Sequence, residues 1–240
     1  MKADSAYTQS GSIVGAQFDK REQLIEVAVF LFLIGPSLIL SFFLIHQGNI
    51  SFMLTAVATT LRDFSLLSLI LFFLWRNSEP ILHIGWTLRD VQREILLGVV
   101  LFVPMFLGAQ SLEQIVRALG LSAPSTPLPS LEPSRSTLEM GVALVLVTVV
   151  AVTEESIFRG YLMLRFKTVF GTWLWSVLLS AFIFSLGHGY EGTAGVVTVG
   201  VMGLVLSLVY IWRKSLVAPI TMHFLQDFVS IVLLPLLVGT

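Results

Sequence analysis

The sequence predicts an all-α protein, a polytopic transmembrane helical bundle of about seven spans. Hydrophobic residues make up 55% of its 240 residues and charged residues only 12%. The mean hydropathy is +0.89. A soluble domain carries about 25% charged residues, so the deficit of charge indicates that lipid surrounds much of the chain. Long apolar segments recur along the chain, and about 20 helical residues suffice to cross a bilayer.

Composition also excludes several classes of function. The net charge is -1, which gives no basic face for nucleic acid, so we expect a lipid bilayer and no nucleic-acid partner. The chain has no cysteine, which rules out disulfides, thiolate catalysis and cysteine metal sites. The polar start lacks the features of a signal peptide, so the first apolar segment is expected to remain as a span. We expect a multi-pass protein of the cell membrane.

Seven apolar segments are predicted to span the membrane. Their approximate bounds are 24–45, 53–76, 94–112, 138–158, 173–190, 194–212 and 216–238. The second contains Arg62 and Asp63, which we interpret as a neutral pair in a bent or interfacial segment. A loop with four prolines in fifteen residues follows the third span, at 122–136. Residues 160–170, which carry Arg165 and Lys167, are expected to form a short interfacial helix.

The basic residues predict the orientation of these spans. Of fourteen lysines and arginines, eleven fall on segments that a cytoplasmic N-terminus would place inside. Arg117 and Arg135 fall on outer loops, and Arg62 is ambiguous. Because positive charge concentrates on the cytoplasmic side, the N-terminus is predicted to be cytoplasmic. We expect three parts: a cytoplasmic tail (1–23), N-terminal spans with the proline-rich outer loop (24–137), and a catalytic transmembrane core (138–240).

Ionisable side chains recur on three predicted spans of that core. Each costs about 2.5–3.5 kcal/mol at membrane depth, so such groups usually face the bundle interior and have partners. A single one is most simply explained as a structural residue. Their presence together on three helices favours a functional site. The residues are Glu154, Glu155, Arg159, His188, His223 and Asp227.

The spacing of these residues indicates how they are grouped. Glu155 and Arg159 are four residues apart, so they share a helical face and can pair. Glu154 lies about 100° around the helix from Glu155 and can point elsewhere. His223 and Asp227 repeat the four-residue spacing. The pattern therefore predicts one carboxylate that is free of the ion pair.

Three short motifs carry a family resemblance. "EESIFR" (154–159), "FSLGH" (184–188) and "HFLQD" (223–227) resemble the ordered motifs EExxxR, FxxxH and HxxxN/D. These are motifs of the CAAX-protease and bacteriocin-processing family, also called the type II CAAX prenyl endopeptidase family. The resemblance covers roughly residues 138–235. It implies an intramembrane endopeptidase in an all-helical bundle.

The resemblance also implies a role for each candidate residue. Glu154 would be the general base that activates water, and His188 would help to hold that water. His223 and Asp227 would stabilise the oxyanion, while Glu155 and Arg159 would orient the site. Such a glutamate-dependent mechanism needs no cofactor.

Alternatives remain beside this interpretation. Glu154, His188, His223 and Asp227 are also a plausible ligand set for zinc, so a zinc-dependent intramembrane metalloprotease is the first alternative. A non-protease membrane transporter or scaffold is the second. The substrate is expected to be a peptide or a prenylated or other membrane protein, and no feature of the sequence separates these.

Two positions of the candidate site need explanation. Asp227 stands where asparagine would be the better hydrogen-bond donor to an oxyanion. On the predicted boundaries, Glu154 and His188 are separated by about 20 Å along the membrane normal, at 1.5 Å per residue. We therefore expect the fifth span to begin later than Trp173, so that His188 lies deeper.

Overall fold

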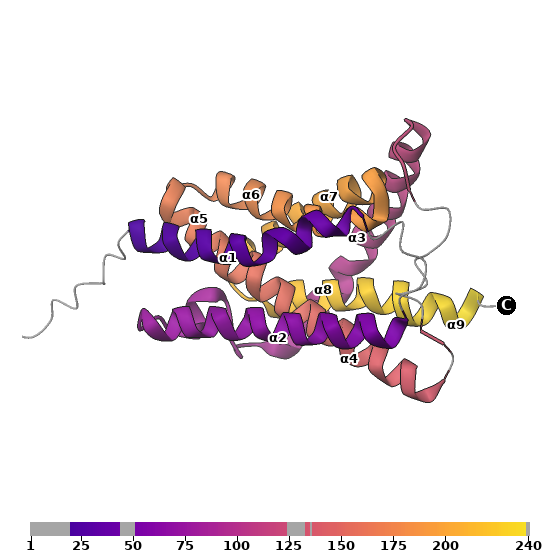
Figure 1. The fold of residues 1–240 in the computed structure, drawn as a ribbon, viewed down its shortest axis with the longest axis horizontal. Coiled ribbons are helices and arrows are strands. Elements are labelled where there is room, and N and C mark those ends of the chain that lie inside the picture. Colours follow the sequence, from indigo (N-terminus) through magenta and orange to yellow (C-terminus); the bar gives the residue numbers. More distant parts are fainter. Residues whose placement is uncertain (1–19, 44–50, 124–132, 135, 239–240) are drawn as a thin grey trace, which may run out of the picture.

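The protein is an all-α helical bundle, as the sequence predicts (Figure 1). The structure, a computed structural model, describes residues 20–43, 51–123, 133–134 and 136–238. Residues 1–19 of the predicted tail, residues 124–132 of the predicted proline-rich loop, and Arg135 lie outside these ranges. The division of the chain into three parts stays a prediction.

Seven apolar helices within the described ranges confirm a polytopic membrane protein. Five of them are long and apolar enough to cross a bilayer. These are α1 (Lys20–Ser41), α2 (Phe52–Arg76), α3 (Val91–Ala118), the helix Thr137–Phe170, and the helix Gly189–Arg213, most of which is α7 (Gly192–Arg213). The two shorter ones are α6 (Trp173–Leu186) and the helix Val217–Leu233.

The fourth long helix is continuous where the sequence suggested a break. It consists of α4 (Thr137–Glu155), a π-helical turn η4 (Ser156–Leu162) and α5 (Met163–Phe170). The predicted separate interfacial helix at 160–170 is therefore wrong. Of the two basic residues of this segment, Arg165 is buried and ion-paired, and Lys167 lies over the ring of Trp173.

This continuity removes the predicted difference in depth between Glu154 and His188. Gly171 ends α5 in the left-handed conformation, with φ of 76°, and α6 begins at Trp173 and packs back along α5. Glu154 precedes Gly171 by 17 residues, and His188 follows it by 17. The two residues thus lie at similar distances from one turn. The helix of the fifth span begins at Trp173 itself, and the antiparallel turn accounts for the depth of His188 without a later start.

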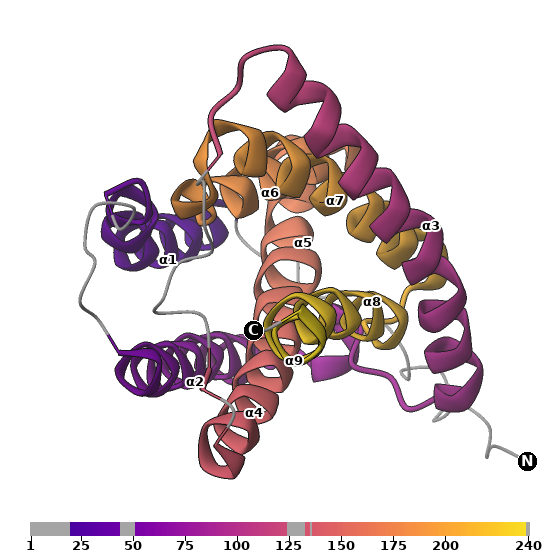
Figure 2. The same ribbon diagram turned by 90° about the vertical axis from the view of Figure 1, so that its right-hand side faces the viewer.

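The last helix occupies the middle of the bundle (Figure 2). It consists of α8 (Val217–Asp227), a second π-helical turn η6 (Phe228–Leu233) and α9 (Leu234–Val238). α8 packs against α3, α4 and α7. The carboxylates at the end of α4 and the histidine of α8 are therefore brought together across the centre of the molecule.

A glycine of α7 allows α6 and α7 to pack closely, as the small residues of this span predict. A Cβ atom on Gly203 would lie 3.1 Å from the ring of Phe184 and 3.3 Å from Ala181. Phe184 is thereby held between α6 and α7, beside the polar centre of the bundle.

A buried network of ion pairs connects α1 and α2 to the long helix Thr137–Phe170. Glu26 of α1 accepts hydrogen bonds from Arg76 of α2 and from the Tyr161 hydroxyl, both at 2.8 Å. Arg165 lies 3.2 Å from Glu26 and 2.9 Å from Glu79. Two carboxylates and two guanidinium groups are paired here, so their charges are compensated and need no catalytic role.

Candidate active site

The two adjacent glutamates end the regular part of α4 and face different surroundings. Glu155 is completely buried, with a side-chain exposure of 0%, whereas that of Glu154 is 16%. The helical rotation of about 100° between neighbours produces this divergence, as predicted. The structure therefore separates a sealed carboxylate from a partly accessible one.

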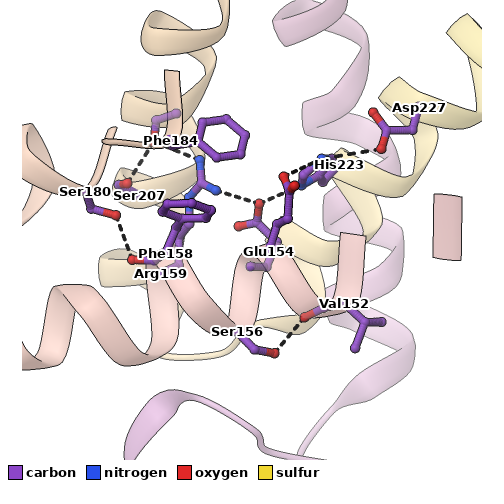
Figure 3. A network of polar contacts seen from close by, with 12 residues as sticks. Val152, Glu154, Ser156, Phe158, Arg159, Ser180, Phe184, Ser207, His223 and Asp227 are labelled. Atoms are coloured by element: carbon purple, nitrogen blue, oxygen red, sulfur yellow. Dashed lines mark hydrogen bonds and ion pairs between the residues drawn. The ribbon is translucent and has the colours of Figure 1, made fainter. Parts of the chain in front are cut away.

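One oxygen of Glu155 contacts both Arg159 and His223, two of the residues labelled in the polar network of Figure 3. Its Oε1 accepts a hydrogen bond from Arg159 Nη1 at 2.8 Å and lies 2.8 Å from His223 Nδ1. The pairing with Arg159 confirms the prediction from the four-residue spacing. The contact with His223 was not predicted, because it joins α4 to α8 across 68 positions of sequence.

Arg159 is fixed by its surroundings as well as by Glu155. Its guanidinium carbon lies 4.2 Å from the centre of the Phe184 ring, a cation–π distance. Its Nη2 donates to the carbonyl of Gly203 at 3.4 Å. A charge that is fully buried requires such partners, so the Phe184 ring and the α7 backbone help to hold Arg159 in place.

His223 is surrounded by carboxylates. Its Nε2 lies 3.5 Å from Asp227 Oδ2 and 3.9 Å from Glu154 Oε2, while Nδ1 faces Glu155. A carboxylate can only accept, so Nδ1 carries the proton in that bond. The ring can donate at both nitrogens only as an imidazolium. In that form, the Nε2–H group would point toward the space between Glu154 and Asp227.

Glu154 keeps an oxygen available at this point. Its Oε2 atom is buried from solvent and has no hydrogen-bond partner among the described residues. A buried carboxylate oxygen usually accepts at least one hydrogen bond. This oxygen is therefore suited to accept one from a small polar molecule beside His223.

His188 is near this group but does not contact it. Its Nδ1 lies 3.1 Å from the carbonyl oxygen of Phe184, and its ring centre lies 4.9 Å from that of Phe184. His223 packs on Phe184 as well, with ring centres 5.8 Å apart. Since a carbonyl only accepts, His188 carries its proton on Nδ1 when neutral, which leaves Nε2 as an acceptor.

The end of α1 fixes the segment around His188. The Ser41 hydroxyl donates to the carbonyl of Leu186 at 2.9 Å. The ring of Phe42 packs directly on Gly189, where a Cβ atom would lie 2.6 Å from the ring. The glycine next to His188 is thus required for the close approach of α1.

Both helices that carry site carboxylates change to π-helix directly after them. η4 begins at Ser156, one residue after Glu155, and η6 begins at Phe228, one residue after Asp227. A π-helical turn widens the helix and rotates the side chains that follow, and such turns are frequent at functional sites. The spacing and composition of the sequence do not predict these two π-helical turns.

A close contact on the far side of the first π turn restricts its sequence. A Cβ atom on Gly160 would lie 2.7 Å from the carbonyl oxygen of Ile84, in the short helix η2 (Ile81–Ile84). On another side, the Ser180 hydroxyl donates to the carbonyl of Phe158 at 2.7 Å. Neighbouring segments therefore support the widened turn next to Glu155.

A charged pair of α2 also faces this site, and sequence reasoning underestimated it. Asp63, whose side chain is 1% exposed, pairs with Arg62 at 2.8 Å. The predicted neutral pair is confirmed, but it lies inside one uninterrupted helix rather than in a bent segment. The charge of Asp63 interacts with those of Glu154 and His223. The high free-energy cost of an aspartate inside a membrane span was the sequence signal that could have identified Asp63 as part of this site.

Of the four predicted zinc ligands, Glu154 and Asp227 lie 3.9 and 3.5 Å from His223 Nε2, whereas His188 packs against Phe184 apart from them. Within the ranges that the structure describes, no three histidine, aspartate or glutamate side chains lie close enough together to hold a metal ion. A zinc site needs three or four such ligands at about 2.0–2.3 Å. The set Glu154, His188, His223 and Asp227 does not fit zinc in this arrangement.

Comparison with known proteins supports the family resemblance. Residues 136–229 match the family model described as Rce1-like, type II CAAX prenyl endopeptidase Rce1-like. All three motifs lie within these residues, so the resemblance drawn from them is confirmed. No curated protein and no solved structure matches the chain.

The shared oxygen of Glu155 leads to a test of stability. Glu155→Ala leaves Arg159 buried without its carboxylate, so we expect the free energy of unfolding to fall by about 3–5 kcal/mol. The double variant Glu155→Leu/Arg159→Met removes both charges and should recover most of that loss. Unfolding in detergent micelles measures both values. As a control, Arg117→Met breaks an exposed pair and should change stability by less than about 1 kcal/mol. Equal losses in the single and double variants would contradict the assignment.

Proposed function

We propose that this membrane protein, whose residues 136–229 match the Rce1-like type II CAAX prenyl endopeptidases, is an intramembrane endopeptidase that uses a glutamate-activated water. One observation carries this proposal. Glu154 Oε2, which has no partner in the described chain, lies 3.9 Å from His223 Nε2, while the adjacent Glu155 is sealed away with Arg159. A base beside a cationic donor is what hydrolysis of an amide requires.

The proposed first step is attack by water. Glu154 accepts a proton from the water while the water oxygen bonds to the carbonyl carbon of the substrate. The Nε2 acceptor of His188 takes part by holding the second hydrogen of that water, once substrate and water occupy the site. General-base assistance of this kind contributes about 10²–10⁴-fold.

The second element is the stabilisation of the oxyanion. The Nε2–H group of His223 donates to the developing negative charge, and Glu155 holds the opposite ring nitrogen. Asp227 accepts from the same Nε2–H in the resting site and so orients the ring. The carbonyl then re-forms and the C–N bond breaks while Glu154 returns its proton to the leaving amine nitrogen, which restores the base and completes the proton balance.

Glu155 and Arg159 are positioning residues in this scheme. Both side chains have an exposure of 0%, so they do not reach the substrate. Their effect passes through His223 and through the Phe184 ring, which contacts Arg159, His188 and His223.

We propose that the reaction needs no cofactor. The position of His188 supports this, since among the described residues it does not join the other three candidate ligands in a group that could hold a metal ion. We place the protein in the cell membrane with its N-terminus in the cytoplasm, on the strength of the distribution of lysine and arginine. The proposed substrates are prenylated peptides or segments of membrane proteins.

Replacement of the base is the direct test of this function. Glu154→Gln keeps the size and polarity of the side chain but removes the proton acceptor, so we expect cleavage to fall by at least about 10²-fold. Insertion and the unfolding temperature should remain close to those of the wild type, because Glu154 makes no ion pair that holds the bundle together. Cleavage of a quenched fluorescent farnesylated peptide measures the rate. Glu22→Gln, an exposed change in the first turn of α1, is the matched control. Full activity of Glu154→Gln would refute the assignment.

Position 227 tests how the oxyanion is stabilised. Asparagine at this position can donate directly to the oxyanion, so Asp227→Asn should retain activity within roughly tenfold of the wild type. Asp227→Ala removes both orientation and donation and should lower kcat by about 10²–10³-fold. Steady-state kinetics on both variants gives the comparison. If asparagine were as damaging as alanine, the carboxylate charge itself would be essential.

Metal content tests the proposed lack of a cofactor. We expect active purified protein to contain far less than one zinc per chain, with activity independent of the residual amount. Elemental analysis alongside the cleavage rate of the same sample measures this. Inhibition by a chelator alone is not decisive, because chelators also act on substrates and detergents. Stoichiometric zinc that tracks with activity would establish the metalloprotease alternative.

A further inference from the structure

An arginine outside the family motifs lies beside the candidate active site. Arg62 is the eleventh of the 25 residues of α2, which packs along α4. Its positive charge is close enough to the carboxylate of Glu154 for the two charges to interact. α2 precedes the residues that match the family model, so no motif assigns a role to Arg62.

The contacts of Arg62 leave part of its guanidinium group available. Its Nε and Nη2 both face one oxygen, Oδ1 of Asp63, at 2.9 and 2.8 Å. A guanidinium group has five N–H donors, so Nη1 keeps its donors for another partner. The side chain is 45% exposed, whereas that of Asp63 is 1% exposed. Asp63 is thus a buried support that orients an accessible cation.

Asp63 is itself incompletely bonded. Its Oδ2 is buried and has no hydrogen-bond partner in the described part of the chain. A buried carboxylate in the middle of a membrane helix is expensive, and such residues usually serve a functional neighbour. Here that neighbour is Arg62, whose Nε and Nη2 are held by Oδ1 of Asp63.

The chemistry of the proposed substrate supplies an anion for this cation. A C-a-a-X motif ends at the C-terminus of its protein, so a bond cleaved within the motif lies no more than about three residues from a free carboxylate. Three extended residues span about 10 Å. A carboxylate that enters a low-dielectric site must be paired, and arginine is the side chain that matches it geometrically.

We propose that Arg62 binds the C-terminal carboxylate of the substrate and so restricts cleavage to bonds close to a free C-terminus. This inference rests on the proposed endopeptidase function and specifies its substrate class. Asp63 is the positioning residue of this subsite, because it orients the guanidinium without touching the ligand. Arg62 leaves Glu154 free as the base, since the two do not form an ion pair in the described structure.

The test compares two peptides that differ only at the C-terminus. A farnesylated peptide that ends in Cys-Val-Leu-Ser is prepared with a free carboxylate and, separately, with a carboxamide. For the wild type, we expect the carboxylate form to be preferred by roughly 10- to 100-fold in kcat/KM, mainly through KM, because a charged hydrogen bond is lost with the amide. Equal kcat/KM for the two peptides would overturn the proposal without any variant.

Variants assign the preference to Arg62. Arg62→Gln should cleave the carboxylate peptide as slowly as the amide peptide, while its rate on the amide peptide stays near that of the wild type. Arg62→Lys keeps the charge and should keep part of the preference. Arg117→Gln, an exposed arginine of α3 paired with Glu113, should keep all of it. An equal loss on both peptides in Arg62→Gln would indicate a general role in catalysis or folding and would overturn the proposal.

The reaction and the subsite fail in different ways. Glu154→Gln tests the reaction and should be inactive on both peptides. If Glu154 is essential but the preference survives in Arg62→Gln, then only the carboxylate subsite is wrong. If Glu154→Gln cleaves both peptides at the wild-type rate, then the proposed base is wrong, whatever the preference at the C-terminus.

Discussion

The shared carboxylate oxygen of Glu155 is the contact on which the centre of this bundle depends. It binds Arg159 on its own helix and His223 on α8, so one buried charge fixes two cationic groups from separate segments. Removal of a partner from such a buried group is far more costly than the loss of an exposed pair. The position of His223, and through it the direction of its free ring nitrogen, therefore follows from the placement of Glu155. The ring of Phe184 completes this arrangement, because Arg159 and both histidines pack on it.

This constraint also divides the two adjacent glutamates into different roles. Glu155 is enclosed, and its Oε1 contacts both Arg159 and His223, which makes it a support. Glu154, one residue earlier, keeps an oxygen available near His223 and is the residue that can exchange a proton in the proposed reaction. The charged pair Arg62–Asp63 of α2 is a further polar group near these two glutamates. Arg62 and Asp63 belong to the part of the chain that precedes the residues matched by the family model, and they lie on α2, which packs against α4.

The helix geometry explains how residues remote in sequence meet at one depth. The helix from Thr137 to Phe170 and the following α6 form an antiparallel pair around Gly171, and Glu154 and His188 lie equally far from that turn. The predicted boundaries placed them about 20 Å apart because the charges of Arg165 and Lys167 were interpreted as marks of the membrane surface. In the structure Arg165 is ion-paired within the protein and Lys167 lies over the Trp173 ring, and the helix continues through both residues. Hydropathy cannot distinguish a charge that faces water from one that faces a buried partner.

The sequence by itself determined the class of fold, the number of apolar helices, the family resemblance and the pairing of Glu155 with Arg159. Each of these depends on composition or on spacing within one helix, and both are local properties of the chain. Only the tertiary structure decided the contact between Glu155 and His223, the separation of His188 from the group around Glu154, the two π-helical turns and the approach of Arg62 and Asp63. These depend on how different helices pack against one another. The physical reason is that a helical period fixes which side chains share a face, whereas the partner of that face is chosen by packing across the whole bundle.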